Sequence, residues 1–469
     1  MSEANGQVLD YDVVVIGAGP AGENVAGRCA DHGMSTAIVE RELVGGECSY
    51  WGCIPSKTLL RPGDALAATR RVPGAREAVQ GAIDLEQVFA RRDYMTSDWH
   101  DGGQLPWLAS KLIVLHRGNG RLAGERRVDV SGSDGVMLSL RARTAVVLAT
   151  GTRAALPPVP GLDGVGPWTN REATETHTVP RRLLVLGGGA VGCEMAQCFR
   201  RLGSQEVTVL EGAQRLLARE EPFAGDEVCA AFEAEGIRVL LGARLTSVRR
   251  DESGAVIARL GDGSEVVGDE ILVATGRVPA TASLGLDKVG LEPGRYVEVD
   301  DALRATGVAG GWLYAVGDCN GLALLTHMGK YQARIAGDVI AGKDARDRAS
   351  RDVVTRVTFT DPQVCAVGPT EAQARERGID VRAVRFPTGD VSGASTQGEG
   401  IRGTSQILVD ESRRLIVGAT FTGPATQELL HSATVAIAGR VAVDILWHAV
   451  PSFPTVSEVW LRLLEAYGL

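Results

Sequence analysis

Residues 11–42 read YDVVVIGAGPAGENVAGRCADHGMSTAIVERE: an apolar run, a glycine turn, a stretch of small residues and a second apolar run that ends in an acid. This order predicts a strand, a helix and a second, parallel strand, which together form a βαβ unit. Residues 181–212 repeat the pattern as RRLLVLGGGAVGCEMAQCFRRLGSQEVTVLEG. Two such units predict an α/β fold with two Rossmann-like domains.

Each unit carries a G-x-G-x-x-G motif after its first strand and a glutamate at the end of its second strand. The first glycine makes a tight turn, the second lets the backbone approach a pyrophosphate, and the third lets the helix pack on the strand. The glutamate accepts hydrogen bonds from ribose hydroxyls. We therefore expect FAD in one unit and a nicotinamide dinucleotide in the other. The motif residues are Gly17, Gly19, Gly22 and Glu40, and then Gly187, Gly189, Gly192 and Glu211.

The composition is that of a globular enzyme. The chain has 469 residues, a net charge of −9, 44% hydrophobic and 23% charged residues, and no basic stripe, which argues against nucleic acid as a partner. The polar N-terminus predicts no signal peptide, and charges interrupt the apolar stretch 431–450, which predicts no membrane span. We expect a cytoplasmic protein.

A close pair of cysteines lies in GGECSYWGCIPSK, residues 45–57. The eight cysteines are too few and too scattered for a disulfide scaffold in a chain of this size. In a reducing compartment, the pair Cys48 and Cys53 is therefore expected to be catalytic or metal-binding. No second Cys or His pair lies nearby, so redox chemistry is favoured over zinc, and we predict no metal site.

Further motifs follow in a fixed order: ATG at 149–151, ATGR at 274–277 and AVGD at 315–318. With the two glycine motifs and the cysteine loop, they make the chain resemble the class I pyridine nucleotide-disulfide oxidoreductases, the family of dihydrolipoamide dehydrogenase, glutathione reductase and mercuric reductase. The resemblance runs essentially end to end and implies a homodimer. It divides the chain into an FAD domain (1–150), an NAD(P) domain (151–275), a central segment that completes the FAD site (276–348) and an α+β dimerisation domain (349–469).

The resemblance also implies how the cysteines work. Cys48 and Cys53 would form a redox-active disulfide against the flavin. Cys53, nearer a helix N-terminus, would become the thiolate that contacts the flavin, because helix-end amides lower the pKa of a thiol. Cys48 would be the interchange thiol that attacks the substrate.

Other residues take family roles by position. Lys57 matches the lysine near flavin N5, and Glu194 matches the glutamate that pairs with it. Asp318 would hold the ribityl chain, and the helix after it, which includes His327, would point its N-terminus at the flavin. The resemblance further assigns to cofactor binding Thr150, Gly151, Gly276 and Arg277.

The choice of nicotinamide rests on Glu211. A carboxylate accepts from a free 2′-hydroxyl and repels a 2′-phosphate, which favours NAD(H). Arg215 could reach a phosphate, so NADP(H) stays open. Ala190 occupies the position at which glutathione reductases carry a gating tyrosine. This difference argues against glutathione reductase activity.

The C-terminus departs from the family pattern. A His-Pro-x-x-x-x-Glu motif normally supplies an acid-base histidine from the other subunit, but this chain reads Phe453-Pro454 with Glu458 in place. Phenylalanine cannot move a proton, and general acid-base catalysis typically contributes about 10² to 10⁴-fold. His448 is the candidate substitute. Mercuric reductases also lack the histidine but use C-terminal cysteines, and this chain has no cysteine after Cys365.

Three functions fit these observations. The preferred one is an FAD enzyme that passes electrons from NADH through the cysteine pair to a disulfide or similar small acceptor. The second is a reductase of quinones, dyes or metal ions. The third is a non-catalytic flavin-binding redox sensor.

Overall fold

The computed structural model describes residues 8–132, 135 and 137–469. The expectation that no signal peptide is present rests partly on residues 1–7, which lie outside the described residues. None of the described helices combines the length and the hydropathy that a bilayer span requires.

The chain forms two compact units, each assembled from three segments, and each is described by itself. The four domain boundaries expected from the sequence stay a prediction. The first unit contains Met1–Pro55, Asp93–Arg153 and Arg277–Arg351, and the second contains Ser56–Arg92, Ala154–Gly276 and Asp352–Leu469.

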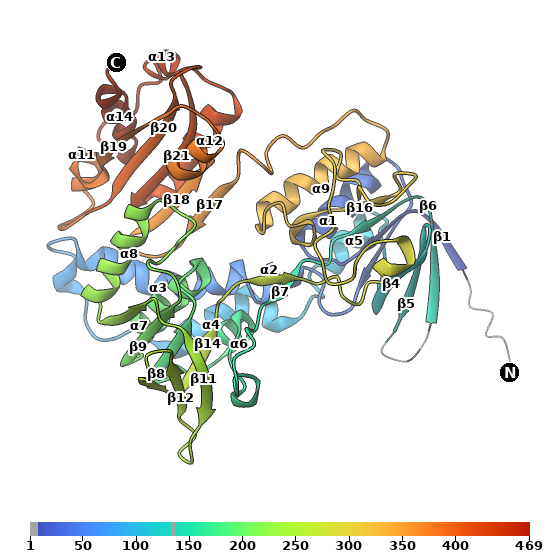
Figure 1. The fold of residues 1–469 in the computed structure, drawn as a ribbon, viewed down its shortest axis with the longest axis horizontal. Coiled ribbons are helices and arrows are strands. Elements are labelled where there is room, and N and C mark those ends of the chain that lie inside the picture. Colours follow the sequence, from blue (N-terminus) through green and yellow to red (C-terminus); the bar gives the residue numbers. More distant parts are fainter. Residues whose placement is uncertain (1–7, 133–134, 136) are drawn as a thin grey trace. The chain divides into compact units, whose positions relative to one another are not determined.

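A mainly parallel sheet forms the centre of the first unit (Figure 1). Val14 of its central strand β1 pairs with Ala37 of β2 on one side and with Val146 of β6 on the other. All three side chains are fully buried, which explains why these strands are apolar runs rather than alternating patterns. The strands are β1 (Val8–Ile16), β2 (Thr36–Glu40), β3 (Val114–Arg117), β4 (Asn119–Gly124), β5 (Arg127–Ser131), β6 (Met137–Leu148) and β16 (Leu313–Ala315), in the order β3-β2-β1-β6-β5-β4 with β16 also on β6.

Helices α1 and α9 pack against each other in this unit (Figure 1). A Cβ on Gly22 would lie 1.9 Å from the Gly17 oxygen, so only glycine lets α1 approach the turn after β1 so closely. The helices are α1 (Pro20–Asp31), α2 (Gly46–Tyr50), α5 (Leu105–Ser110) and α9 (Thr326–Ile340), with 3-10 helices η2 (Ser97–Trp99), η4 (Leu286–Val289) and η5 (Gly317–Asn320). Residues of both units are found in α3 (Cys53–Arg70) and α4 (Leu85–Met95), and β7 (Thr152–Ala154) pairs with β15 (Arg277–Pro279).

The second unit contains the other βαβ unit, with the same close helix packing. A Cβ on Gly192 would lie 1.9 Å from the Gly187 oxygen. A parallel sheet β10-β9-β8-β14 and an antiparallel sheet β11-β12-β13 build this part. Its elements are η1 (Arg76–Ala78), η3 (Asp163–Val165), α6 (Asn170–Glu175), β8 (Arg182–Leu186), α7 (Ala190–Leu202), β9 (Glu206–Glu211), α8 (Pro222–Ala234), β10 (Ile237–Leu241), β11 (Leu245–Arg250), β12 (Val256–Leu260), β13 (Glu265–Gly268) and β14 (Glu270–Val273).

An antiparallel sheet, β17-β18-β21-β20-β19, forms the C-terminal part of the second unit (Figure 1). Its core includes Phe421, whose ring lies 5.8 Å from that of Trp460 in an edge contact. Its elements are β17 (Thr355–Thr358), β18 (Gln363–Val367), α10 (Glu371–Glu376), β19 (Val381–Pro387), η6 (Thr388–Asp390), α11 (Ser392–Ser395), β20 (Thr404–Asp410), β21 (Leu415–Gly423), α12 (Thr426–Ala438), α13 (Val443–Leu446), η7 (Val456–Glu458) and α14 (Val459–Tyr467).

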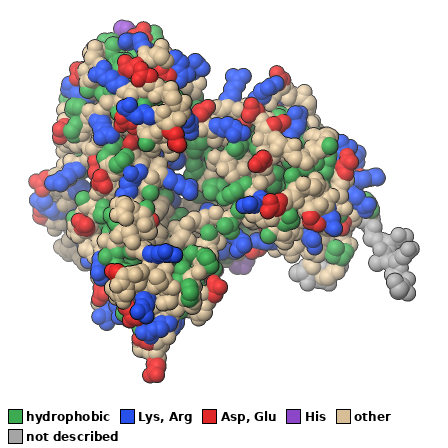
Figure 2. Space-filling view, viewed as in Figure 1, with side chains coloured by type: hydrophobic (Ala, Val, Ile, Leu, Met, Phe, Trp, Pro, Cys, Tyr) green, Lys and Arg blue, Asp and Glu red, His purple; other side chains and the backbone are tan. Residues whose placement is uncertain are grey.

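Acidic and basic side chains are interspersed over the face of each unit that Figure 2 shows. This distribution agrees with a composition in which 49 Lys and Arg residues accompany 58 Asp and Glu residues. A mixed surface of this kind creates no extended field of one sign.

Candidate active site

The cysteine loop lies against the first glycine motif. Gly45 N–H donates to the Ala18 oxygen at 2.8 Å. A Cβ on Gly46 would lie 2.7 Å from Gly19 Cα, the N-cap of α1, so the two backbones are in direct contact. The sequence therefore brings the loop and the motif together through three glycines.

Cys48 and Cys53 are neighbours whose side chains form a hydrogen bond with each other. Cys48 lies in α2 and is half-buried, whereas Cys53 begins α3 and is exposed. A hydrogen bond with Cys53, together with burial, raises the pKa of Cys48 far above its usual value.

Thr326 contacts both sulfurs and was not found by sequence reasoning. Its Oγ1 lies 3.4 Å from Cys53 Sγ, and its hydrogen bond to Cys48 lowers the pKa of that thiol. Thr326 is the first residue of α9, where unpaired helix amides also favour negative charge. The only feature of the sequence that pointed to Thr326 was its position next to His327, a residue predicted to lie near the flavin. The His327 side chain is exposed.

Lys57 and Glu194 form the ion pair that the resemblance implies. Lys57 Nζ donates to Glu194 Oε2 at 2.7 Å, and only 6% of the Glu194 side chain is exposed. Phe359, which sequence reasoning missed, completes the group: its N–H donates to Glu194 Oε1 at 3.0 Å, and its ring lies 4.7 Å from Lys57 Nζ. Lys57 follows Cys53 by one helical turn on α3.

Asp318 is held in the first unit by Thr152 and Arg277. Thr152 Oγ1 donates to Asp318 Oδ2 at 2.8 Å, and Arg277 Nε donates to Thr152 Oγ1 at 2.6 Å. Burial raises the pKa of Asp318, and the hydrogen bond from Thr152 and the charge of Arg277 oppose that rise. Gly276, predicted with Arg277, lies in the second unit, where its oxygen accepts from Ala155 N–H at 3.0 Å.

The first unit fits FAD. Glu40 is fixed at the end of β2, because its carboxylate accepts from Ala18 N–H at 2.7 Å and from Glu42 N–H at 2.8 Å. Thr150 Oγ1, directly before Gly151, is buried and has no hydrogen-bond partner among the described residues. A half-buried carboxylate on Asp318, an unsatisfied hydroxyl and a close glycine turn are the polar groups and the backbone approach that a ribityl diphosphate requires.

The second unit contains Glu211 and Arg215, the two residues that the sequence predicts to influence the choice of nicotinamide. Glu211 accepts from Gly188 N–H at 2.5 Å and from Ala213 N–H at 2.7 Å, and Gly189 is the N-cap of α7. Arg215 Nη2 donates to the carbonyls of Ala218 and Glu220 at 2.8 and 3.3 Å, which uses this nitrogen for the protein's own backbone.

The C-terminal segment carries an unexpected ion pair. Arg462 Nη2 donates to Glu458 Oε1 at 2.8 Å, while Glu458 Oε2 is buried with no hydrogen-bond partner among the described residues. Phe453 is 73% exposed. His448 is also exposed rather than packed beside the tryptophan that precedes it. A cavity of 310 Å³ lies here, lined by Leu446, Trp447, Ala449, Val450, Pro451, Phe453, Glu458, Leu461, Arg462 and Leu464.

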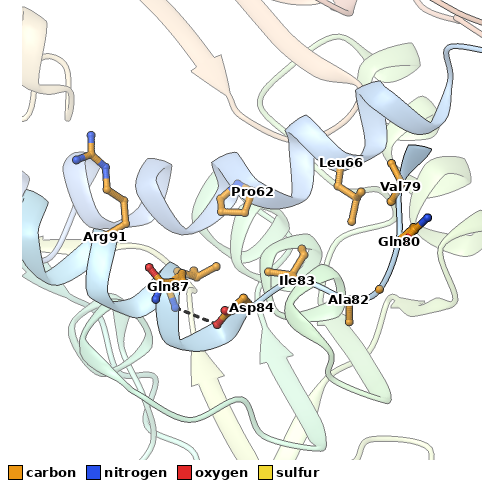
Figure 3. A pocket seen from close by; sticks show the side chains of 11 residues that line it. Pro62, Leu66, Val79, Gln80, Ala82, Ile83, Asp84, Gln87 and Arg91 are labelled. Carbon is orange, nitrogen blue, oxygen red and sulfur yellow. Dashed lines mark hydrogen bonds between the residues drawn. The ribbon is translucent and has the colours of Figure 1, made fainter. Parts of the chain in front are cut away.

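A cavity of 370 Å³ lies elsewhere in the second unit, between α3, the segment 79–84 and α4 (Figure 3). Leu66, Ile83 and Pro62 give it apolar walls, and Asp84 accepts from Gln87 N–H at its edge. No residue predicted to bind or react lines it, so the active site is assigned from the motifs rather than from cavity size.

Comparison with known proteins identifies the family. Residues 11–336 match the pyridine nucleotide-disulphide oxidoreductase family, and residues 354–463 match its dimerisation domain. Dihydrolipoyl dehydrogenase of Chlamydia muridarum is 31% identical over 455 residues, covering 96% of this chain and 95% of the relative. Mercuric reductase of Staphylococcus aureus is 29% identical, covering 96% of this chain and 81% of the relative.

Solved structures agree. A Cu(II) complex of the HOCl-induced flavoprotein disulfide reductase RclA from Escherichia coli is 26% identical with a TM-score of 0.85, covering 97% of this chain and 99% of that one. LpdA from Mycobacterium tuberculosis is 26% identical with a TM-score of 0.86, covering 98% and 100%. These matches confirm the predicted fold class, and the dimerisation domain indicates the homodimer of the family. The chain therefore belongs to the pyridine nucleotide-disulphide oxidoreductase family and is an FAD-dependent NAD(P)H disulfide oxidoreductase.

Proposed function

We propose that the protein is an NADH-dependent reductase that passes electrons through the Cys48–Cys53 pair to a disulfide or a similar small acceptor. The observation that carries this proposal is the Cys48–Cys53–Thr326 group, which lies in the same unit as the residues that fit FAD. When bound, FAD supplies a two-electron carrier between the nicotinamide and the disulfide. We also propose a cytoplasmic location, because eight scattered cysteines are too few for a disulfide scaffold in a chain of this size.

The thiol chemistry balances as two exchange steps. Cys48 gives up its proton to solvent as it attacks one sulfur of the acceptor disulfide, which forms a mixed disulfide and releases the first thiolate. Cys53 then attacks the sulfur of Cys48, which releases the second thiolate and re-forms the Cys48–Cys53 disulfide. The two released thiolates take up two protons, and NADH supplies the two electrons that reduce the pair again.

Phe453 sets the kind of acceptor. A general acid normally protonates the departing thiolate, and a phenylalanine cannot do so. A thiolate of low pKa leaves without that help, because exchange is faster when the leaving thiol is more acidic. We therefore propose a disulfide of acidic thiols as the best substrate, with Lys57 and Glu194 in the family roles that the sequence predicts.

The preference for NADH rests on Glu211. Its carboxylate stands at the end of β9, where it would accept from a ribose 2′-hydroxyl and repel a 2′-phosphate. Arg215, the residue that would favour NADPH, donates instead to two backbone carbonyls.

A second candidate acceptor is a thiophilic metal ion or a quinone. Two relatives support it by their descriptions, a mercuric reductase and the Cu(II) complex of RclA. Neither acceptor needs a departing thiolate to be protonated. Among the described residues, no group of three or more His, Cys, Asp or Glu side chains could hold a metal, so such an ion would be bound as substrate by the two thiols.

A panel of acceptors separates these candidates. Purified enzyme with NADH or NADPH is assayed with an aryl disulfide, oxidised glutathione, a soluble quinone and Cu(II), for wild type and Cys48→Ser. If the acceptor is a disulfide, wild-type enzyme should oxidise NADH with the aryl disulfide, and Cys48→Ser should abolish this activity. Turnover with the quinone should survive in Cys48→Ser. Disulfide turnover that persists in Cys48→Ser, or turnover with quinone or Cu(II) alone, would contradict the first proposal.

A further inference from the structure

Four side chains of the first unit form a continuous chain of contacts between the cysteine loop and the FAD-binding residues. Glu47 Oε1, in the residue directly before Cys48, lies 3.5 Å from Arg277 Nη2. Arg277 Nε donates to Thr152 Oγ1 at 2.6 Å, and Arg277 Nη2 also donates to the Thr152 oxygen at 3.0 Å. Thr152 Oγ1 in turn donates to Asp318 Oδ2 at 2.8 Å. The contacts begin in α2 and end in η5.

The direction of each hydrogen bond is fixed. A guanidinium has only donors, so the Thr152 hydroxyl must accept from Arg277 and give its own proton to Asp318. Asp318 Oδ2 is thereby used by the protein, which assigns Oδ1 to a ribityl hydroxyl. Oδ1 of Asp318 stays available only as long as Thr152 lies between Arg277 and Asp318.

We infer that Glu47 is a positioning residue for FAD: it holds Arg277 away from direct pairing with Asp318 and so keeps one oxygen of Asp318 available to the cofactor. The guanidinium contacts the Glu47 carboxylate directly and reaches the Asp318 carboxylate through Thr152. Glu47 and Arg277 are only 27% and 23% exposed, so their attraction is weakly screened. Without the Glu47 charge, Arg277 is expected to move toward Asp318, the other carboxylate in this chain of contacts. A bidentate arginine–aspartate pair would then occupy both Asp318 oxygens, including the Oδ1 that is otherwise left for the cofactor.

This position also ties the cofactor to the reactive loop. Glu47 is covalently adjacent to Cys48, and its backbone carbonyl accepts from Trp51 N–H at 2.9 Å. Glu47 therefore moves together with α2. A loop that shifts when the cysteines react therefore changes how firmly FAD is held. The inference rests on FAD binding and not on the identity of the acceptor.

The test is the affinity of apoprotein for FAD, measured by titration of flavin fluorescence. Glu47→Gln keeps the size of the side chain and removes its charge, and we expect it to weaken FAD binding about fivefold or more, the usual scale of coupling between sites. Glu125→Gln, at an exposed position of the same unit, is the matched control and should leave the affinity unchanged. An unchanged affinity in Glu47→Gln would overturn the inference.

Two further measurements separate positioning from a merely structural role. Glu47 contributes to raising the pKa of Asp318, so the acid limb of FAD binding should move to lower pH in Glu47→Gln and not in Glu125→Gln. In an Arg277→Met background, Glu47→Gln should weaken FAD binding no further, because Glu47 acts through Arg277. An additional loss there, or an unmoved acid limb, would overturn the inference. If Glu47→Gln does not fold, Glu47→Asp, which keeps the charge but shortens its reach, should weaken FAD binding by a smaller factor, and an unchanged affinity there counts equally against it.

Discussion

Glu458 is paired with Arg462, one helical turn further along the chain, at 2.8 Å. The family motif would place a histidine at position 453, and the chain has Phe453 instead. Only 8% of the Glu458 side chain is exposed, and its second oxygen is buried without a hydrogen-bond partner among the described residues. The arginine thus compensates the charge of Glu458 without supplying a proton donor of suitable pKa, since a guanidinium stays protonated.

Phe453→His should restore proton delivery. We expect turnover with an unactivated disulfide such as oxidised lipoamide to rise about a hundredfold, at the low end of general acid-base effects. Turnover with an aryl disulfide should change little, because its thiolate leaves unprotonated. Steady-state assays with both substrates check this, and Val450→His, at another exposed position in the same segment, is the control. Equal gains in both variants would contradict the account.

Glu211→Ala should narrow the preference for NADH over NADPH by removing the charge that repels a 2′-phosphate. The measurement is the ratio of kcat/KM values for the two nucleotides. Because Glu211 also accepts two backbone N–H groups, KM for NADH should rise as well. A ratio equal to that of wild type would contradict a role of Glu211 in selecting between the two nucleotides.

Thr326→Val should make the reduced cysteines harder to ionise. The Thr326 hydroxyl lowers the pKa of Cys48, so its loss moves thiol alkylation by iodoacetamide to higher pH. Thr326→Ser keeps the hydroxyl and should restore the wild-type pH profile. A profile that is the same in all three proteins would show that the contact does not act on the thiols.

Glu23→Gln should stabilise the apoprotein at alkaline pH. Burial raises the pKa of Glu23 from 4.5 to about 7, with Lys330 opposing and Glu40 adding to the rise, and Oε1 has no hydrogen-bond partner among the described residues. The folded state therefore binds the extra proton, and the stability present at low pH is lost as pH rises through about 7. Chemical denaturation should show a gain of about 3 kcal/mol at pH 8 relative to pH 4.5. A gain of the same size at both pH values would contradict the assignment.

The sequence was sufficient for the parts of the site that lie within local motifs. Both glycine turns, the two strand-end glutamates and the cysteine loop could be located because their spacing follows from one βαβ unit at a time. Lys57 and Glu194, 137 positions apart, were paired only through the family resemblance.

Contacts between distant segments could not be predicted in the same way. Thr326, Phe359 and Arg462 carry no motif of their own, and their roles come from the side chains that folding brings to them. Glu47 was visible in the loop, but its link to Arg277 depends on how β15 returns to the first unit. Arg215 was within reach of a phosphate by sequence spacing, whereas backbone carbonyls engage it in the folded chain.

The central claim is that electrons from NADH reach the Cys48–Cys53 disulfide. The most direct test is an anaerobic titration of the oxidised holoenzyme with NADH, followed by alkylation and mass spectrometry of the two cysteines. The account predicts uptake of about two equivalents of NADH per FAD, one for each two-electron couple, with Cys48 and Cys53 both becoming labelled. Uptake of about one equivalent, with the two cysteines still joined and unlabelled, would contradict it.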